Sequence, residues 1–269
     1  MSAESRRARF RELHAREQLF VMPNPWDVGS ARVLEALRFE ALATTSAGFA
    51  WALGKLDMQV TRDELVAHVA QLAPATELPL NVDSERCYPD DPGGVTETVR
   101  LLGEAGAAGC SIEDWNPVAG RIEDVGLAVE RVAEAAAAAR AFDPPLVLTG
   151  RAENHLHGVD DLDDTIARLV AYRDAGADCV YAPWLSTVEQ ISAVVDAVGV
   201  PVNVLATPAV PSVPELADVG VRRVSTGSLL AGVAYGALAA AARDLQGGST
   251  STYAADRLAE DDKQAAFGR

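Results

Sequence analysis

The sequence has few cysteines, since only three of its 269 residues are of this type. Cys87, Cys110 and Cys179 are far apart, odd in number and without Cys-x-x-Cys spacing. This pattern argues against a disulfide framework and against a zinc site built on paired thiols. We expect a reduced compartment. Cys110 and Cys179 are predicted to be core residues of apolar strands, and Cys87 a partly buried small residue rather than a reactive group.

Long apolar runs are also absent from the chain. No stretch approaches the roughly 18 uninterrupted apolar residues that a membrane span requires. The first residues, MSAESRRARFREL, are charged and have no apolar signal-peptide core. We interpret them as an opening helix, and we expect a cytoplasmic protein.

Positive charge is scarce, because 23 lysines and arginines face 39 aspartates and glutamates, for a net charge of −16. An acidic surface repels nucleic acids and anionic membranes, so we expect neither as a partner. An anionic substrate would need a local positive group, such as a metal ion or a placed arginine.

The sequence does contain a repeated alternation of short apolar runs and helical patterns. The runs are 19–23, 42–45, 78–82, 109–112, 146–149, 179–182, 201–205 and 223–226. The helical segments are 29–37, 61–72, 92–104, 126–140, 160–175, 187–198, 213–219 and 228–245. Apolar strands without alternation indicate a buried parallel sheet.

Eight such units predict an α/β protein with a (β/α)8 TIM barrel, and a doubly wound sheet is the alternative. We predict one barrel domain over residues 1–246. The tail, 247–269, begins with flexible residues and becomes compatible with a helix, so it is either disordered or packed on a partner subunit.

Acidic residues follow three neighbouring predicted strands, at the barrel end where catalytic groups lie. Asp83 and Glu85 close the third strand, and Glu113 closes the fourth. Carboxylates that converge from adjacent strands repel one another, and a hard divalent cation relieves that repulsion. The residues therefore predict a Mg²⁺ site, with Mn²⁺ as the alternative ion. Helix capping by these acids is the competing interpretation.

Arg151, after the fifth strand, could grip a substrate carboxylate with its planar fork, or could form an ion pair with Glu113 or Glu153. The second strand ends in the turn TTSAG, where Ser46 and backbone N–H groups of small residues could receive an oxyanion or a carboxylate. Trp26, Trp51 and Trp184 could line an apolar wall.

Six stretches resemble, in order and spacing, the isocitrate lyase/phosphoenolpyruvate mutase superfamily, nearest its 2-methylisocitrate lyase/carboxyphosphonoenolpyruvate mutase-like branch. They are FVMPNPWDVGSARVLEALRFEALATTSAG, LGKLD, VDSE followed by Tyr and DDP, GCSIED, LTGRAEN and DAGADCVYAPW. The resemblance spans about residues 10–245.

The resemblance implies a barrel that forms a homotetramer, as a dimer of dimers with the last helix swapped between paired subunits. It implies Mg²⁺ on Asp83 and Glu85, with Glu113 in the metal shell through water. Ser46, Ala47 and Gly48 would hold the carboxylate and oxo oxygen of a small carboxylic acid. Asp57, on a mobile segment, would help to build the site, Arg151 would contact the substrate, and Asn203 would be a further polar contact.

The chain departs from the family in the loop after the fourth strand. Lyases that cut isocitrate or 2-methylisocitrate carry a cysteine acid there, whereas the stretch EDWNPVAGRIEDVG has no Cys, His or Lys. Mutases carry Glu-Asp-Lys followed by an Asn-Ser element, but here Trp115 replaces the lysine and no Asn-Ser follows. Both departures argue against those particular activities.

We predict a Mg²⁺-dependent lyase that cleaves a carbon–carbon bond of a small 2-oxo or 2-hydroxy acid through a metal-chelated enolate. Arg151, Asp57 and Glu113 are the predicted catalytic residues. Two alternatives stay open, which are C–P bond chemistry on phosphonopyruvate-like substrates and a non-catalytic 2-oxo-acid binding protein. The sequence identifies no proton donor. We interpret His155 and His157 as helix-start or interface residues, with acid–base catalysis as the alternative.

Overall fold

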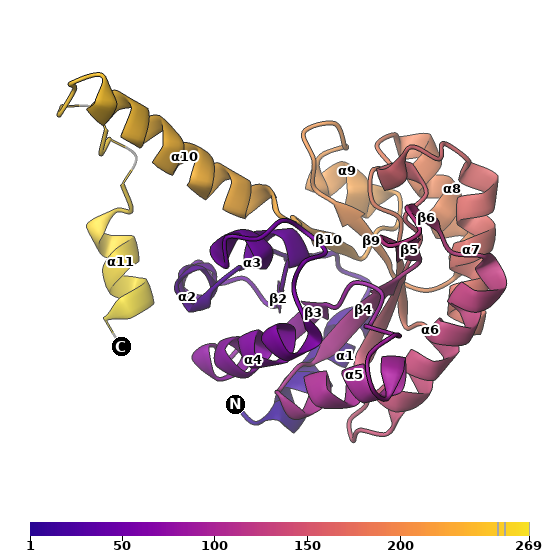
Figure 1. Ribbon diagram of the computed structural model, residues 1–269. Helices are drawn as coiled ribbons and strands as arrows, with labels where there is room; N and C mark the ends of the chain where they lie inside the picture. The colour runs from indigo at the N-terminus through magenta and orange to yellow at the C-terminus, as the bar shows by residue number, and fades with distance from the viewer. Residues whose placement is uncertain (252, 256, 269) are drawn as a thin grey trace.

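Eight parallel strands form a nearly closed barrel surrounded by helices, as a computed structural model of the chain shows (Figure 1). The structure describes residues 1–251, 253–255 and 257–268. Along the sheet the order is β1-β10-β9-β8-β7-β4-β3-β2. The strands are β1 Phe20–Met22, β2 Leu42–Ala43, β3 Leu80–Asp83, β4 Gly109–Glu113, β7 Val147–Arg151, β8 Cys179–Tyr181, β9 Val202–Leu205 and β10 Arg223–Ser225. Each lies within or directly beside one of the eight predicted runs, so the predicted barrel fold is confirmed.

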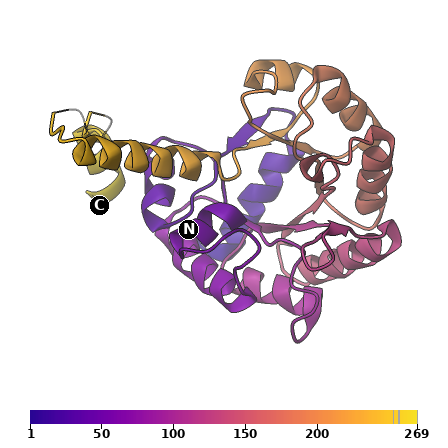
Figure 2. The same ribbon diagram turned by 45° about the horizontal axis from the view of Figure 1, so that its top comes forward.

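Most of the helices surround the strands, which Figure 2 shows from a second direction. They are α1 Ala3–Ala15, α2 Val28–Ala36, α3 Ser46–Ala52, α4 Arg62–Leu72, α5 Gly94–Glu104, α6 Val125–Arg140, α7 Leu162–Asp174, α8 Val188–Val198, α9 Val213–Asp218, α10 Leu229–Gln246 and α11 Glu260–Phe267. Short 3₁₀ helices lie at Ala73–Ala75 (η1) and His155–His157 (η2). The sequence sets several starts through capping boxes, such as Thr61 with Glu64 before α4.

Two small elements differ from the sequence-based expectation. The TTSAG stretch is the start of helix α3, because the Thr45 hydroxyl accepts a hydrogen bond from the Gly48 N–H and so caps it. The loop after β4 contains an antiparallel hairpin of β5 (Trp115–Asn116) and β6 (Arg121–Ile122). Both elements are too short to produce a detectable period in the sequence.

Helix α1 packs its apolar side chains against residues of the neighbouring strands. Phe10 and Leu13 form a buried cluster with Phe20 and Met22 of β1 and with Val147 of β7. This small core is separate from the main one, which lies between the strands and the outer helices.

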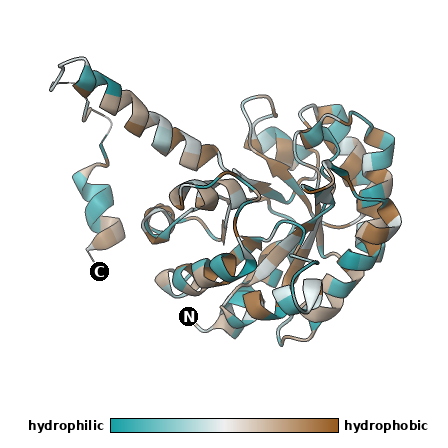
Figure 3. Ribbon diagram, viewed as in Figure 1, coloured by the Kyte–Doolittle hydropathy of each residue, from teal (hydrophilic) through white to brown (hydrophobic). Residues whose placement is uncertain are grey.

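Helix α10 extends away from the barrel, and α11 returns beside α2 (Figure 1). Hydrophobic residues occur along the length of α10 although it leaves the barrel surface (Figure 3). Ala266 of α11 is buried. The predicted boundary at residue 246 coincides with the end of α10, and the division into one barrel domain and a C-terminal tail remains a prediction. Within the described residues, no helix has the length and apolar content to cross a membrane.

The seam between β1 and β2 is closed by few contacts, and Asn24 supplies several of them. The Ala43 N–H donates to the Pro23 carbonyl at 3.1 Å. The Asn24 side chain donates to the Thr44 carbonyl at 2.7 Å, and its oxygen accepts from the N–H groups of Thr226 and Gly227 at 2.8 and 3.0 Å. Asn24 thus ties the first strand to both of its neighbours.

Replacing Asn24 with alanine is therefore expected to lower the free energy of unfolding by about 2–4 kcal/mol, because buried donors and acceptors lose their partners. Urea unfolding at equilibrium would measure the loss. Asn116→Ala, which removes turn contacts in the β5–β6 hairpin and one hydrogen bond to Glu123, is the control and should cost less. A loss under about 0.5 kcal/mol for Asn24→Ala would contradict the role of this residue.

Candidate active site

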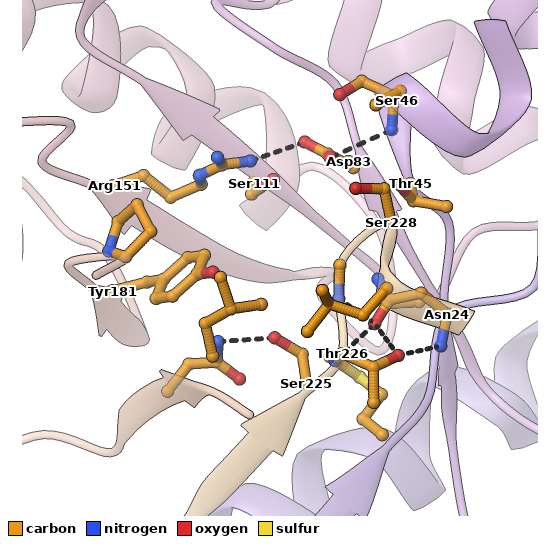
Figure 4. A pocket seen from close by; sticks show the side chains of 18 of the residues that line it. Asn24, Thr45, Ser46, Asp83, Ser111, Arg151, Tyr181, Ser225, Thr226 and Ser228 are labelled. Carbon is orange, nitrogen blue, oxygen red and sulfur yellow. Dashed lines mark hydrogen bonds and ion pairs between the residues drawn. The ribbon is translucent and has the colours of Figure 1, made fainter. Parts of the chain in front are cut away.

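A cavity of about 400 Å³ opens at the carboxyl ends of the strands and reaches into the barrel (Figure 4). Its walls include the predicted site residues Ser46, Ala47, Asp57, Asp83, Arg151 and Asn203. The predicted residues Gly48, Glu85 and Glu113 do not line it. Trp184 lines the cavity, whereas Trp26 and Trp51 do not. The structure thus gathers most of the predicted site around one opening.

Asp83 is held in place by contacts to both oxygens of its carboxylate. One carboxylate oxygen accepts from the Ser46 backbone N–H at 3.1 Å, and the other pairs with Arg151 Nη1 at 2.6 Å. Its own N–H donates to the Thr44 hydroxyl at 2.8 Å. Strand β3 therefore presents a fixed carboxylate to the cavity.

Arg151 joins carboxylates that arrive on three different segments. Its Nη2 lies 3.2 Å from Glu113 Oε2, and its Nε donates to Glu153 Oε1 at 2.9 Å, in addition to the pair with Asp83. Register explains the geometry, because Glu113 and Arg151 are paired residues at the ends of β4 and β7. Arg151 is therefore both a lining residue of the cavity and the counter-charge for the surrounding acids.

Glu85 reaches this group by a turn of the backbone rather than by strand alternation. Strand β3 ends at Asp83, and Glu85 has a left-handed φ of 50°. A non-glycine residue rarely adopts this conformation, which costs free energy. The Glu85 carbonyl accepts from the Glu113 N–H at 3.0 Å, which fixes the turn. The sequence predicts that Asp83 and Glu85 both close this strand, but the chain leaves the strand between them.

Negative charge exceeds positive charge around Arg151. Burial, and then repulsion from Asp83 and Asp57, raise the pKa of Glu85 to about 8. Burial is also the main cause that raises the pKa of Glu113, and it raises the pKa of Glu153 to about 7. Glu113 Oε1 is buried and has no hydrogen-bond partner. The excess of carboxylates over cations would favour the binding of a further cation at this site.

These residues fit a magnesium ion that keeps much of its water shell. Mg²⁺ binds through one or two carboxylates and several waters, and the unpartnered Glu113 oxygen could accept from such a water. Within residues 1–251, 253–255 and 257–268, no three Asp, Glu, His or Cys side chains already form a direct metal cage. The residues therefore fit a hydrated ion. Asp83 would contact it directly, and Glu85 and Glu113 would contact it through bound water.

Added Mg²⁺ is expected to stabilise the protein more at pH 8 than at about pH 5.5. A carboxyl group with a raised folded pKa contributes stability below its unfolded pKa, and this contribution is lost as pH rises through the folded value. For Glu85 and Glu153 that window runs from the ordinary value of 4.5 to about 8 and about 7. The metal-free protein should therefore become less stable across this range.

A bound cation opposes that loss, because it favours the ionised carboxylates. Thermal unfolding with EDTA and with Mg²⁺, at both pH values, would test the prediction. Glu85→Gln should reduce the difference between the two pH values. An equal shift in Tm at both values would contradict the proposed metal position.

The start of α3 contributes to the site differently from the expectation. The Ser46 N–H is already bonded to Asp83, and the Gly48 N–H to the Thr45 hydroxyl. A Cβ at Gly48 would lie 2.6 Å from a Thr45 methyl and 3.2 Å from Ala231 Cβ. Gly48 thus allows close packing of α3, while Ser46 and Ala47 face the cavity.

The groups considered as alternative acids lie outside the cavity. His157 stacks on Trp115 with ring centroids 3.5 Å apart, and His155 Nδ1 lies 3.3 Å from Asp160. The Trp115–His157 stack joins the β5–β6 hairpin to η2. Cys87 is fully buried, and burial raises the pKa of its thiol to about 12. Cys110 and Cys179 are buried in β4 and β8, as predicted.

The floor of the cavity contains a polar network that the sequence did not reveal. Arg223 is buried, and its Nε donates to Asn203 Oδ1 at 2.9 Å, while its Nη2 donates to the Thr149 hydroxyl at 2.9 Å. The Asn203 amide donates in turn to Ser225 Oγ at 2.8 Å. Period-two spacing could have placed Arg223 and Ser225 on one face of β10, but only tertiary structure brings Asn203 and Thr149 to them.

Comparison with known proteins identifies the family of the chain. A sequence model of the phosphoenolpyruvate phosphomutase family matches residues 10–246. An uncharacterised protein of Mycobacterium tuberculosis is 34% identical over 241 residues, which is 89% of each chain. An oxaloacetate decarboxylase of Paraburkholderia xenovorans is 34% identical over 217 residues, covering 76% of this chain and 70% of that protein.

Solved structures extend the similarity to the fold. A putative lyase/mutase from Burkholderia cenocepacia has a TM-score of 0.94 and 47% identity, and the alignment covers 99% of this chain and 97% of the other. An oxaloacetate acetylhydrolase bound to oxalate has a TM-score of 0.86 at 24% identity, covers 99% and 95% of the two chains, and shows likeness of fold alone. The chain belongs to the phosphoenolpyruvate phosphomutase family, within the isocitrate lyase/phosphoenolpyruvate mutase superfamily.

Proposed function

We propose that the protein is a Mg²⁺-dependent lyase that cleaves a carbon–carbon bond of a small 2-oxo acid, most simply by decarboxylation. The observation that carries the proposal is the cavity wall on which Asp83, Arg151 and the start of α3 meet. This arrangement offers a fixed carboxylate for a cation and a guanidinium beside it. Both stabilise negative charge that develops on a substrate oxygen.

Decarboxylation requires fewer catalytic groups in the cavity than fission of a 2-hydroxy acid does. Fission requires a base that removes the hydroxyl proton, whereas loss of CO₂ from a 3-carboxy-2-oxo acid requires only an electron sink. In the described part of the chain, no histidine, cysteine or lysine lines the cavity. Of its two lining carboxylates among the described residues, Asp83 is already paired with Arg151, which leaves Asp57 as the one group that could act as such a base. The similarity to an oxaloacetate decarboxylase over 76% of this chain supports the same choice.

Each predicted residue then has a definite task. Asp83, with Glu85 and Glu113 through water, would hold Mg²⁺, and the ion would supply Lewis-acid charge at the substrate oxygens. Arg151 orients the substrate carboxylate with its fork and keeps the three acids paired in the free site. Asp57, in the irregular segment 53–60, lies in the wall of the cavity and adds a carboxylate to it.

A turnover screen tests the proposal. Oxaloacetate, 2-methylisocitrate, isocitrate, dimethylmalate-type acids and phosphonopyruvate would be incubated with the protein and Mg²⁺ and followed by NMR. We expect the protein to consume oxaloacetate or a close 2-oxo acid, and we expect Glu85→Gln to lose this activity. Consumption of phosphonopyruvate alone would replace the proposal with C–P chemistry. Binding of 2-oxo acids without any turnover would replace it with the binding-protein alternative.

We also propose that α10 packs on a second copy of the chain within a homotetramer. Val233 and Leu238 are 70% and 64% exposed, and among the residues of α10 only Ala231 is buried in the described chain. An isolated helix with this much exposed apolar surface favours association. Light scattering should give four times the 28.3 kDa chain mass, and Val233→Asp with Leu238→Asp should lower it. An unchanged mass in the double variant would contradict the proposed interface.

A further inference from the structure

We propose that Tyr181 is the proton donor of this site, and that Ser225, Asn203 and Arg223 orient its hydroxyl. The inference rests on the proposed lyase function and supplies the group that the sequence leaves unnamed. It is carried by the position of Tyr181 in the cavity and by the direction of the hydrogen bonds beneath it.

Tyr181 ends strand β8 and lines the cavity together with Asp83 and Arg151. Its side chain lies between those of Arg151 and Ser225 (Figure 4). The Arg151 guanidinium lies 5.2 Å from the centre of the Tyr181 ring. The phenol is therefore next to the cation that would face the developing negative charge, and within a largely buried environment.

The directions of the hydrogen bonds can be assigned from Arg223, because a guanidinium can donate but cannot accept. Arg223 Nε donates to Asn203, so the acceptor on Asn203 must be its oxygen. This fixes the amide, and its nitrogen must then face Ser225 Oγ and donate to it at 2.8 Å. A hydroxyl has one proton of its own, so the Ser225 proton is left to donate elsewhere.

Ser225 is a side-chain hydrogen-bond partner of the Tyr181 phenol, and both residues line the cavity. Burial is the main cause that raises the pKa of Tyr181. Because Asn203 already donates to Ser225 Oγ, we assign the remaining Ser225 proton to the Tyr181 oxygen. The Tyr181 oxygen then accepts from Ser225, and its own proton is free to point into the cavity. Burial keeps this proton on the phenol at neutral pH.

Arg223, at the start of this hydrogen-bond network, is held by a neutral histidine. Arg223 Nη1 lies 3.0 Å from His14 Nε2, and His14 Nδ1 lies 2.8 Å from the Phe10 carbonyl. The proton of His14 therefore resides on Nδ1, and Nε2 accepts from Arg223. Burial lowers the pKa of His14 to about 3, so this ring stays neutral. Arg223 thus keeps its donor role over the whole working range of pH.

The step balances without a further reagent. In decarboxylation the bond between C3 and the leaving carboxylate breaks, CO₂ departs and the electron pair remains on the enolate of the product. Tyr181 transfers its proton to C3, which becomes a C–H bond of the keto product, and the phenolate regains a proton from water. A positioned phenol is an established type of general acid.

The test uses the full-length protein with Mg²⁺ and separates proton transfer from bond cleavage. Oxaloacetate consumption gives kcat and KM, and exchange of pyruvate methyl protons in D₂O, followed by NMR, reports protonation of the enolate in reverse. We expect Tyr181→Phe to slow exchange by at least about 100-fold, with KM changed less than about threefold. Consumption of oxaloacetate should fall less than exchange, because enolpyruvate can leave and form pyruvate in solution.

Three further variants make the result specific. Tyr253→Phe, at a residue that is 45% exposed and does not line the cavity, makes the same change elsewhere and should keep both rates. Ser225→Ala should slow exchange about tenfold through loss of one hydrogen bond, and Ser225→Thr, which retains a hydroxyl, should restore it. Circular dichroism and Tm would confirm that each variant folds.

Two outcomes would overturn the inference in distinguishable ways. Exchange in Tyr181→Phe within about threefold of the wild-type rate would exclude Tyr181 as the donor, while leaving the lyase function intact. A wild-type protein that consumes no 2-oxo acid and exchanges no pyruvate protons would overturn the proposed function, and the inference with it.

Discussion

Asp83→Asn is expected to lower kcat/KM by about 1,000-fold or more while the barrel stays folded. Asparagine has the same shape and can still accept the hydrogen bond from the Ser46 N–H. It lacks the charge that pairs with Arg151 at 2.6 Å and that would hold Mg²⁺. Loss of several kcal/mol of charge stabilisation corresponds to this factor, because each 1.36 kcal/mol changes a rate about tenfold.

Steady-state kinetics and calorimetric titration of Mg²⁺ would measure this loss together. Asp124→Asn is the matched control, because Asp124 is also acidic but its side chain is 82% exposed. It should leave both rate and Mg²⁺ affinity unchanged. If Asp83→Asn kept Mg²⁺ affinity and a rate within tenfold of the wild type, the proposed metal position would be wrong.

Arg151→Met is expected to remove activity and also to destabilise the fold. The change leaves Asp83, Glu113 and Glu153 without their shared counter-charge in a buried environment. Removing one partner of a buried ion pair costs about 3–5 kcal/mol. The cost should be smaller at low pH, because burial has already raised the pKa values of Glu113 and Glu153 and protonation then removes their charge.

Urea unfolding at about pH 5.5 and at pH 8 would measure this dependence. Arg151→Lys keeps one charge but cannot reproduce three separate contacts from a planar fork. It should therefore recover more stability than activity. Equal destabilisation of Arg151→Met at the two pH values would show that the three carboxylates do not depend on this guanidinium.

The barrel and part of the site could be predicted from sequence because their signals are local. Continuous apolar runs mark buried parallel strands, and strand ends mark the catalytic face. Asp83 and Arg151 follow from that rule, and the structure places both in the cavity wall. The rule fixes which end of the barrel a residue occupies, but not which neighbour its side chain contacts.

Other features depend on tertiary packing and leave no local signal. Glu85 reaches the site through a left-handed turn that its sequence gives no reason to expect. Asn203 matched a polar position of the family, yet both ends of its amide are bonded to Arg223 and Ser225. Gly48 matched a substrate contact, and the structure uses it for close packing. These contacts join residues from different strands, which spacing along one strand cannot reveal.

The stack of Trp115 on His157 has a consequence for how a substrate enters. The stack holds the β5–β6 hairpin against η2, so these two elements are fixed to each other. Asp57, which also lines the cavity, belongs to residues 53–60, a segment with no helix or strand. If that segment swings outward, a negative charge leaves with it. The open entrance then repels an incoming dianion less than the closed site does, and closure restores the charge after the anion is inside.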